Sequence, residues 1–427
     1  MPNVSYPGPD TIHKFDLANG LRLLVYENMA VDLVVVDALW RAGALAVPRE
    51  KAGLADLTAA MLLRGTEHRS FSQIYAELES VGASLYFDGG RQVSEFGGTC
   101  LSEDLPMLLG LAAEALTRPT FPVEQLERVR GERLTGLQIR ANDTRAVAAR
   151  TFREMLYPEG HPYSIAVGGY EATLPAISRD DLIAFHRDYY GPRDAIITVV
   201  GAVTAEQARE LVEAAFGGWQ NPGQLALPVA ADVDRPVQIK RRYMPLTDKT
   251  QTDIILGWTG PRRNEPDYME ASLANTILGV FGMMGRLGKS VREEQGLAYY
   301  ASSRLQSGLG PSSWQVSTGV APDKAEQAIA SIRAEIRRMQ DEPVTEEELA
   351  DCQAYRTGSL PVSLETNDGL SDIIMNIEYL GLGDDYLQRF PAIINSVTVA
   401  DIQRVAQTWL DPDAFILALA GPPEGEG

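Results

Sequence analysis

The chain has 427 residues, of which 45% are hydrophobic and 22% charged, so it is long enough for two or more domains with sizeable cores. Its 58 acidic residues outnumber 38 basic ones, and a net charge of −20 argues against nucleic acid or an anionic membrane as a partner. Two cysteines, Cys100 and Cys352, are too few for a disulfide framework or a cysteine metal site.

The first residues contain neither a basic segment nor the apolar segment of a signal peptide. No apolar run approaches the roughly 18 residues that a membrane helix needs. We therefore expect a cytoplasmic protein that binds neither nucleic acid nor membrane.

The first part of the chain predicts a hairpin followed by helices. Alternating strands flank a turn at Asn19-Gly20, and residues 31–43 predict a longer strand. A helix is predicted over 53–64, ending before Gly65, because apolar residues recur there at three- and four-residue spacing. These residues are Leu54, Leu57, Met61 and Leu62.

The next elements follow from capping and turn signals. Ser70 is the expected N-cap of a second helix over 71–81. Two strands are predicted in 84–99 around Gly89-Gly90, and the pattern from 102 to 142 is helical.

Two segments of the chain are similar at a separation of 220 residues. Each predicts a capped helix, a turn and a buried strand, one over 177–203 and the other over 397–423. The matching pairs are Ser178 and Thr398, Asp181 and Asp401, Pro192 and Pro412, and Gly201 and Gly421. A strand over 253–260 and a helix over 268–278 likewise parallel the strand and helix that begin the first half.

This pattern indicates an internal duplication. It predicts an N-terminal domain over 1–220, a Pro- and Ala-rich linker over 221–236, and a C-terminal domain over 237–427. We expect the α+β fold class, with two homologous domains that each pack helices on one face of a mostly antiparallel sheet.

The helix at 53–66, GLADLTAAMLLRGT, is followed by Arg69-Ser70 and by ELESVG at 77–82. This arrangement resembles the insulinase, pitrilysin and mitochondrial-processing-peptidase family of zinc peptidases, the inverzincins. The resemblance covers essentially the whole chain. It implies paired domains and a clamshell-type assembly, in which two chains or two fused halves close around a peptide chamber.

Active members of that family carry the inverted zinc motif H-x-x-E-H on this helix. Here the motif positions hold Asp56, Ala59 and Ala60, so both ligand imidazoles and the general base are missing. The later glutamate ligand corresponds to Gln138 or Leu137. A single aspartate cannot supply the three protein ligands of a catalytic zinc site. We therefore predict no metal and no cofactor in this chain, with zinc expected in a partner.

The second half keeps another part of the family pattern, GMMGRLGKSVREEQGLAYYASSR at 282–304. It resembles the family's glycine-rich loop, here with Gly282 and Gly285, followed by an arginine and a tyrosine that reach toward the zinc site in active complexes. The matching residues are Arg292 and Tyr299, since Tyr299 rather than Tyr300 has the family's spacing. A guanidinium and a phenol can bind the substrate carbonyl and stabilise the oxyanion. On residue types alone, a turn and a solvated helix end explain the same stretch.

Other candidates are weaker. A family-like loop at His161-Pro162-Tyr163 is expected to order structure, and isolated histidines are expected at the surface or as caps. These are His13, His68 and His186. No Ser or Cys nucleophile has a recognisable elbow or partner histidine. The resemblance makes 84–96 the edge-strand region on which substrate is laid. Its family polar positions hold Tyr86, Gln92 and Ser94, which speaks against peptide binding by the first half.

Three functions follow from these residues. The leading one is a non-catalytic subunit of a two-chain zinc metallopeptidase, whose homologous partner carries H-x-x-E-H and cleaves a peptide substrate. The alternative is an inert homodimeric peptide-binding or scaffold protein of the same fold. A hydrolase with a displaced metal site is disfavoured, because the chain has four histidines and none has ligand-like spacing.

Overall fold

The computed structural model describes residues 6–281 and 284–423, which form two compact units. The first unit contains Met1–Leu137, Ile165–Val229 and Leu360–Gln388. The second contains Gln138–Ser164, Ala230–Ser359 and Arg389–Gly427. Each unit therefore includes a short segment from the opposite half of the sequence.

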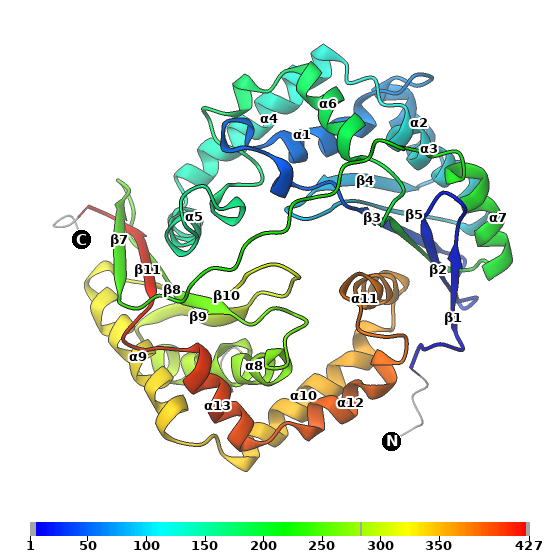
Figure 1. Ribbon diagram of the computed structural model, residues 1–427. Coiled ribbons are helices and arrows are strands. Elements are labelled where there is room, and N and C mark those ends of the chain that lie inside the picture. The colour runs from blue at the N-terminus through cyan, green and yellow to red at the C-terminus, as the bar shows by residue number, and fades with distance from the viewer. Residues whose placement is uncertain (1–5, 282–283, 424–427) are drawn as a thin grey trace. The chain divides into compact units, whose positions relative to one another are not determined.

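The first unit is built on a six-stranded sheet in the order β1-β2-β6-β3-β5-β4 (Figure 1). Its β2 and β6 are parallel, and the other neighbouring pairs are antiparallel. The strands are β1 (Ile12–Asp16), β2 (Arg22–Glu27), β3 (Val34–Trp40), β4 (Ser84–Gly89), β5 (Ser94–Cys100) and β6 (Ile196–Gly201).

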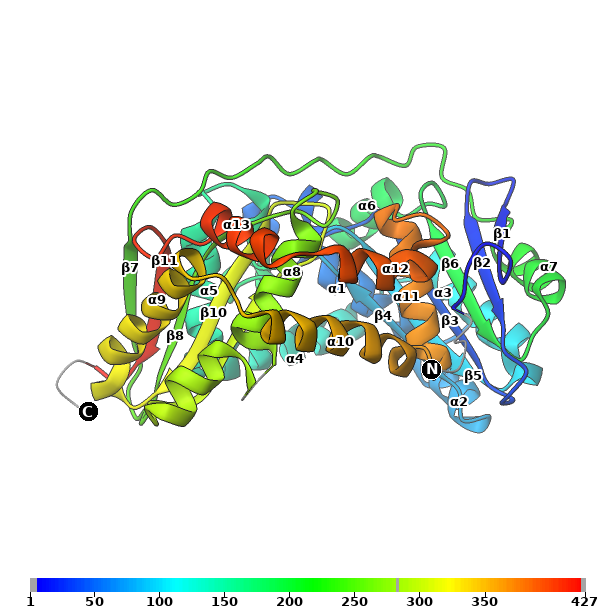
Figure 2. The ribbon, with the colours of Figure 1, turned by 90° about the horizontal axis from the view of Figure 1, so that it is seen from below.

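One face of this sheet carries the main core, which includes the fully buried Trp40 and Phe96. Helices of the first half cover it: α1 (Leu54–Met61), α2 (Phe71–Ser80), α3 (Leu105–Thr117), α4 (Val123–Ala141), α6 (Arg179–Tyr189) and α7 (Ala205–Phe216). In both views α7 lies beside β2, on which it packs (Figures 1 and 2).

Among the described residues, one helix packs on the opposite face of the first sheet. This helix, α11 (Asn367–Leu380), comes from the second half of the sequence and contacts β3 and β6. Its Leu370 and Ile374 join a small core with Leu39 and Val200. Because α11 covers only the middle of this face, the side chains that β4 and β5 place on it, Tyr86, Asp88 and Glu95, are exposed.

The second unit has a five-stranded sheet in the order β7-β11-β8-β10-β9, in which only β7 and β11 are parallel. Its strands are β7 (Lys240–Pro245), β8 (Thr252–Gly260), β9 (Ala298–Leu305), β10 (Ser312–Val320) and β11 (Ile416–Gly421). Helix α5 (Thr144–Leu156), from the first half of the sequence, packs on one face through Val147 and Phe152. The remaining helices are α8 (Tyr268–Asn275), α9 (Ala325–Asp341), α10 (Glu346–Ser363), α12 (Tyr386–Ser396) and α13 (Val399–Trp409).

The structure confirms the predicted fold class and most predicted elements. Gly20 makes the hairpin turn at φ 93°, and Ser70 caps α2 in a reciprocal capping box with Gln73. The α6–β6 and α13–β11 segments have the same lengths 220 residues apart, and both helices begin with a capping box. The duplication itself stays an interpretation. The sequence did not predict helix α5, which packs on the second sheet, or helix α11, which packs on the second face of the first sheet.

The stretch predicted as a linker, residues 221–236, has no helix or strand and runs as extended chain (Figure 2). In the part of the chain that the structure describes, no helix combines the length and the apolar character needed to cross a membrane.

Candidate functional site

The helix at which the sequence predicts a degenerate zinc motif is α1. It begins after Gly53, which has φ 102° and no room for a Cβ beside Leu174. Asp56 lies in its first turn, where the helix dipole favours a carboxylate. Ala59 is fully buried and Asp56 and Ala60 are half-buried, so the face that carries these three positions is largely enclosed by the protein.

Asp56 is held by an arginine of α4. Arg133 donates from Nε to Oδ2 of Asp56 over 2.8 Å and from Nη2 to Oδ1 over 3.2 Å. This fork-to-fork geometry is the strongest that a guanidinium and a carboxylate can make. It neutralises the one acid at the motif and places a fixed positive charge where a metal dication would have to bind.

The other motif positions offer no replacement ligand. Ala60 and Leu137 pack against the core of the first unit, and Gln138 is exposed. Within the described residues, no three His, Cys, Asp or Glu side chains are grouped closely enough to hold a metal ion. The residues present therefore do not fit a catalytic zinc, and we derive no chemical step through one in this chain.

Arg292 lies in a π-helical segment, Gly288–Glu294, of the second unit. Its backbone is fixed because its carbonyl accepts from Gly296 N, and Leu297 is buried beyond the turn. Gly296 has φ 61°, a conformation that favours glycine. The Arg292 side chain is exposed, and no described residue forms a hydrogen bond or ion pair with it.

Tyr299 lies near the start of β9, the edge strand of the second sheet. Gly319 pairs with Tyr300 and Val320 with Ala298, so Tyr299 is the extra residue of a β-bulge. A bulge re-aims the side chain that it carries. Tyr299 is 70% exposed, and no described side chain accepts from its hydroxyl.

The glycine-rich loop is only partly visible. Gly282 lies outside the described residues. Gly285 packs so closely against Gly279 that an added Cβ would lie 3.3 Å from the Gly279 Cα. This packing explains the need for a small residue at 285.

Sequence reasoning set Tyr300 aside, but the structure gives it a defined environment. Its hydroxyl donates to Oδ1 of the buried Asp253 over 2.6 Å, and the guanidinium of Arg145 lies 4.6 Å from its ring centroid. Thr144 and Gln251 also donate to Asp253. Burial and the bond to Asp253 raise the Tyr300 pKa. The phenol thus stays protonated and anchors the strand beside Tyr299.

The remaining predicted residues form structural contacts. The expected edge strand is β4, with Tyr86 exposed on it. Ser94 is buried and donates to the Ala42 carbonyl, whereas the Gln92 side-chain oxygen accepts from Tyr379. Each histidine has a neighbour: His186 contacts the Leu116 carbonyl at the end of α3, His161 the Ala231 carbonyl, His68 Arg118, and His13 Glu27.

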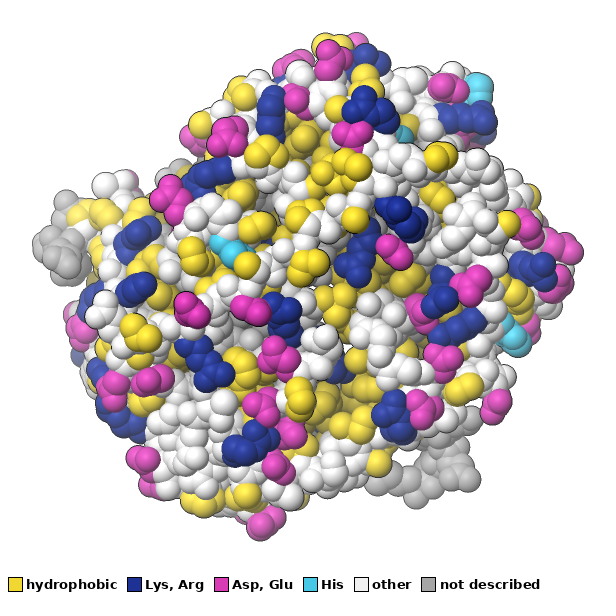
Figure 3. All heavy atoms as spheres, viewed as in Figure 1, with side chains coloured by type: hydrophobic (Ala, Val, Ile, Leu, Met, Phe, Trp, Pro, Cys, Tyr) yellow, Lys and Arg dark blue, Asp and Glu magenta, His cyan; other side chains and the backbone are white. Residues whose placement is uncertain are grey.

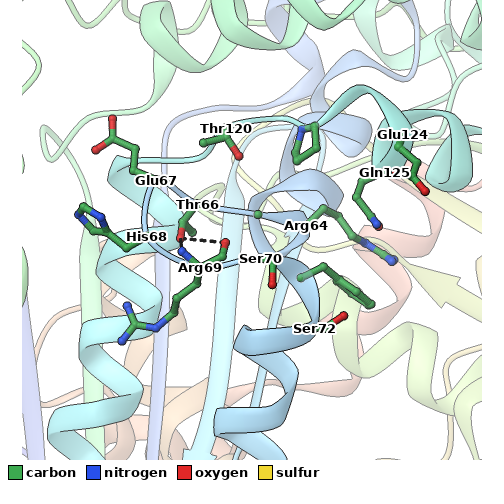
Figure 4. A pocket seen from close by; sticks show the side chains of 13 residues that line it. Arg64, Thr66, Glu67, His68, Arg69, Ser70, Ser72, Thr120, Glu124 and Gln125 are labelled. Atoms are coloured by element: carbon green, nitrogen blue, oxygen red, sulfur yellow. Dashed lines mark hydrogen bonds between the residues drawn. The ribbon is translucent and has the colours of Figure 1, made fainter.

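A concave surface of the first unit lies where α2 begins, beside the α3–α4 connection (Figure 4). Arg64 and Arg69 line it, but Glu132, Glu77 and Glu114 pair with them. On the face of the molecule seen in Figure 3, basic and acidic side chains are interspersed among the described residues. Neither feature is the broad basic patch typical of nucleic-acid binding.

The fold and the altered α1 helix define a peptidase-like protein of two sheet domains. Two family models match the chain: "Insulinase (Peptidase family M16)" over residues 25–157 and "Peptidase M16 inactive domain" over 176–355. The chain belongs to this insulinase family of peptidases, and it has the inactive-domain type of fold.

Relatives match along most of the chain. An uncharacterized zinc protease of Streptomyces coelicolor is 25% identical over 412 residues, 94% of this chain and 87% of the relative. The uncharacterized zinc protease YmxG of Bacillus subtilis is 23% identical and covers 96% of this chain and 98% of its own length. The beta subunit of the mitochondrial-processing peptidase of Rattus norvegicus is 26% identical over 62% of this chain and 53% of its own.

Solved structures agree on the fold. A peptidase M16 inactive domain from Pseudomonas fluorescens has a TM-score of 0.88 at 24% identity, covering 96% of this chain and 98% of its own. A protease from Helicobacter pylori has a TM-score of 0.89 at 18% identity, covering 98% of this chain and all of its own.

Proposed function

We propose that this chain is the zinc-free subunit of a two-chain zinc metallopeptidase. A homologous partner with an intact H-x-x-E-H would bind zinc, which supplies an activated water. This chain would help to close the peptide chamber and contribute Arg292 and Tyr299. One contrast supports the proposal. Asp56 is paired with Arg133 inside the chain, whereas the side chains of Arg292 and Tyr299 are exposed.

The chemistry of this pair suits a carbonyl oxygen that becomes an oxyanion. A phenol and a guanidinium both donate hydrogen bonds, and the guanidinium also carries a fixed positive charge. No described residue forms a hydrogen bond or ion pair with either side chain. The Arg292 carbonyl accepts from Gly296 N, and Tyr299 lies between Ala298 and Tyr300, which both pair with β10. Such preorganised donors stabilise developing charge without reorganising during the reaction.

The test compares variants of the purified two-chain complex. Tyr299→Phe removes the exposed hydroxyl, and we expect kcat/KM for peptide cleavage to fall on the order of 100-fold. Tyr300→Phe is the matched control, because it deletes a neighbouring hydroxyl that faces Asp253 instead. It should leave kcat/KM within a few-fold of wild type. Zinc content and assembly should be unchanged in both complexes.

Equal cleavage rates for wild-type and Tyr299→Phe complexes would overturn the proposal. A chain that purifies only as a homodimer, and gains no activity from any partner, would favour the inert peptide-binding or scaffold alternative.

A further inference from the structure

A second concave surface of the first unit has a volume of about 350 Å³. It lies where β2 and β6 begin side by side, next to the residue that follows β3 and the last turn of α11. We call it the strand-end hollow. Its charged lining residues are Asp16, Arg22, Arg41, Asp194 and Glu378.

One wall of the strand-end hollow is a closed network of charges. Arg22 donates from Nε to Oδ1 of Asp16 over 2.7 Å and from Nη1 to the carboxylate of Glu378. Lys14 also donates to Glu378, over 2.6 Å. These groups neutralise one another, so they form a rigid polar wall and leave the other two charges of the hollow unpaired.

Arg41 is the unpaired cation of the hollow. It follows the fully buried Trp40 and precedes the fully buried Ala42, so strand alternation turns its side chain to the opposite face, toward α11. Its guanidinium lies 5.1 Å from the ring centroid of Tyr379, whose hydroxyl donates to Gln92 over 2.8 Å. Arg41 is half-buried, and no described residue forms a hydrogen bond or ion pair with it. Its N–H donors are therefore available in a fixed place.

Asp194 is the unpaired anion of the hollow. It lies in a turn that Ala195 N closes on the Pro192 carbonyl over 3.1 Å, and its φ is 60°. Arg22 N donates to the Ala195 carbonyl over 2.9 Å, which ties this turn to β2. The Asp194 side chain is exposed, and no described residue forms a hydrogen bond or ion pair with it. The backbone thus holds a free carboxylate at the rim of the hollow that Arg41 lines.

We propose that the strand-end hollow binds a small zwitterion, a free α-amino acid. Its carboxylate would accept from the Arg41 guanidinium, whose planar fork suits a carboxylate, and its ammonium would donate to Asp194. The lining contains two guanidinium groups and three carboxylates. A simple anion would therefore meet more negative than positive charge, and a simple cation would leave Arg41 unpaired. A ligand that carries both charges close together satisfies both free groups.

This site goes beyond the proposed subunit role. All of its residues belong to the first unit of this chain. Its test needs neither zinc nor a partner, so a failure here and a failure of the two-chain proposal are distinguishable.

The experiment titrates three small molecules into the full chain at low ionic strength and follows binding by saturation-transfer difference NMR. L-alanine carries both charges, propionate is alanine without the ammonium, and ethylamine is alanine without the carboxylate. We expect propionate and ethylamine to bind at least about tenfold more weakly than alanine, as for the loss of one charge-assisted hydrogen bond. Tri-alanine, in which the two charges are far apart, should also bind more weakly.

Two variants assign each charge of the ligand to a residue. Arg41→Met keeps an unbranched side chain beside Tyr379 but removes the guanidinium, and it should weaken binding of both alanine and propionate about tenfold. Asp194→Asn keeps a residue that tolerates the left-handed conformation. It should weaken alanine binding about tenfold and leave propionate binding no weaker than in wild type.

Arg209→Met is the matched control. Arg209 lies on α7, outside the hollow, and its guanidinium is also near an aromatic ring, 5.5 Å from the Phe15 centroid. This variant should bind alanine like wild type.

Four results would overturn the proposal. Equal affinity for alanine and propionate would remove the role of the ammonium, and wild-type alanine binding by both Arg41→Met and Asp194→Asn would place the ligand elsewhere. An equal loss in Arg209→Met would assign the effect to net charge. Tighter binding of tri-alanine than of alanine would rule out a site for a free amino acid.

Discussion

Each sheet has a tyrosine on an edge strand, a glycine opposite it on the next strand and an aspartate opposite the glycine on the third strand. These Tyr–Gly–Asp rows are Tyr300, Gly319 and Asp253 in the second unit and Tyr86, Gly97 and Asp37 in the first. The two rows have opposite electrostatics. In the second unit the row is closed: Asp253 is buried, accepts from Thr144, Gln251 and Tyr300, and has a guanidinium nearby over the ring. In the first unit Asp37 accepts from Ser371, and the charges that act on it come from other carboxylates.

This difference separates a row whose aspartate has several donors from one whose aspartate is surrounded by other carboxylates. Buried carboxylates are stable when donors satisfy them, and the second unit provides those donors internally. The first unit keeps the same strand pairing, but no cation among the described residues forms an ion pair with Asp37. A carboxylate is likewise paired internally at α1, where Arg133 donates to Asp56.

The largest predicted effect comes from removing each aspartate. Asp253→Ala leaves three donors without an acceptor and should lower the free energy of unfolding by about 3–5 kcal/mol. Asp37→Ala removes a carboxylate that is poorly compensated and should cost less than about 1 kcal/mol at pH 7. Urea denaturation followed by circular dichroism measures both. Equal losses would contradict the distinction between a closed and an open row.

A smaller contrast is expected at the two glycines. Gly319→Ala pushes its Cβ against Tyr300 and Gln251, which are held by Asp253, and should cost about 1–3 kcal/mol. Gly97→Ala displaces only the Tyr86 ring, which can turn into solvent, so its cost should be under about 1 kcal/mol. Thermal unfolding of the two variants checks the order, and a larger loss for Gly97→Ala would reverse it.

A further expected effect is a pH dependence at Asp37. Burial is the main cause that raises the Asp37 pKa from 3.8 to about 6. The hydrogen bond from Ser371 lowers this pKa, and the negative charges of Asp372, Asp368 and Glu95 raise it. Asp88 and Tyr86 on β4 and the Thr198 hydroxyl on β6 share this face. Between pH 4 and 6 the folded chain holds a proton that the unfolded chain has lost, so this group lowers stability as the pH rises.

Asp37→Asn removes that loss. At pH 7 the variant should be more stable than wild type by about 1–2 kcal/mol, and near pH 4 the two proteins should be equally stable. The figure at pH 7 allows for solvent screening, because Asp37 is half-buried. The raised pKa values of Glu95 and Asp372 should leave some slope in the variant. Unfolding curves at pH 4, 5, 6 and 7 provide the test, and parallel stability profiles would refute it.

Local signals predicted much of the fold. The Asn19-Gly20 turn, the Ser70 cap and the spacing of apolar residues in α1 act within a few residues of chain, so the sequence indicates them directly. The pairing of α5 and α11 with sheets from the opposite half of the sequence depends on contacts more than 100 residues apart, and no local pattern shows it.

The candidate site residues stay predictions. The family motif indicated Asp56, Arg292 and Tyr299, because each has a fixed spacing in the sequence. The role of Arg133 could not be predicted, since it depends on how α4 packs beside α1. The Tyr–Gly–Asp rows escaped notice because strand register, rather than sequence distance, brings their residues together.

The most direct test of the proposed function is gentle affinity purification of this chain from its native host, followed by mass spectrometry, zinc analysis and a peptidase assay. We predict an equimolar companion of similar mass that bears H-x-x-E-H, one zinc per pair, and peptide cleavage by the pair. Recovery of this chain alone as a homodimer, without zinc or activity, would contradict the account.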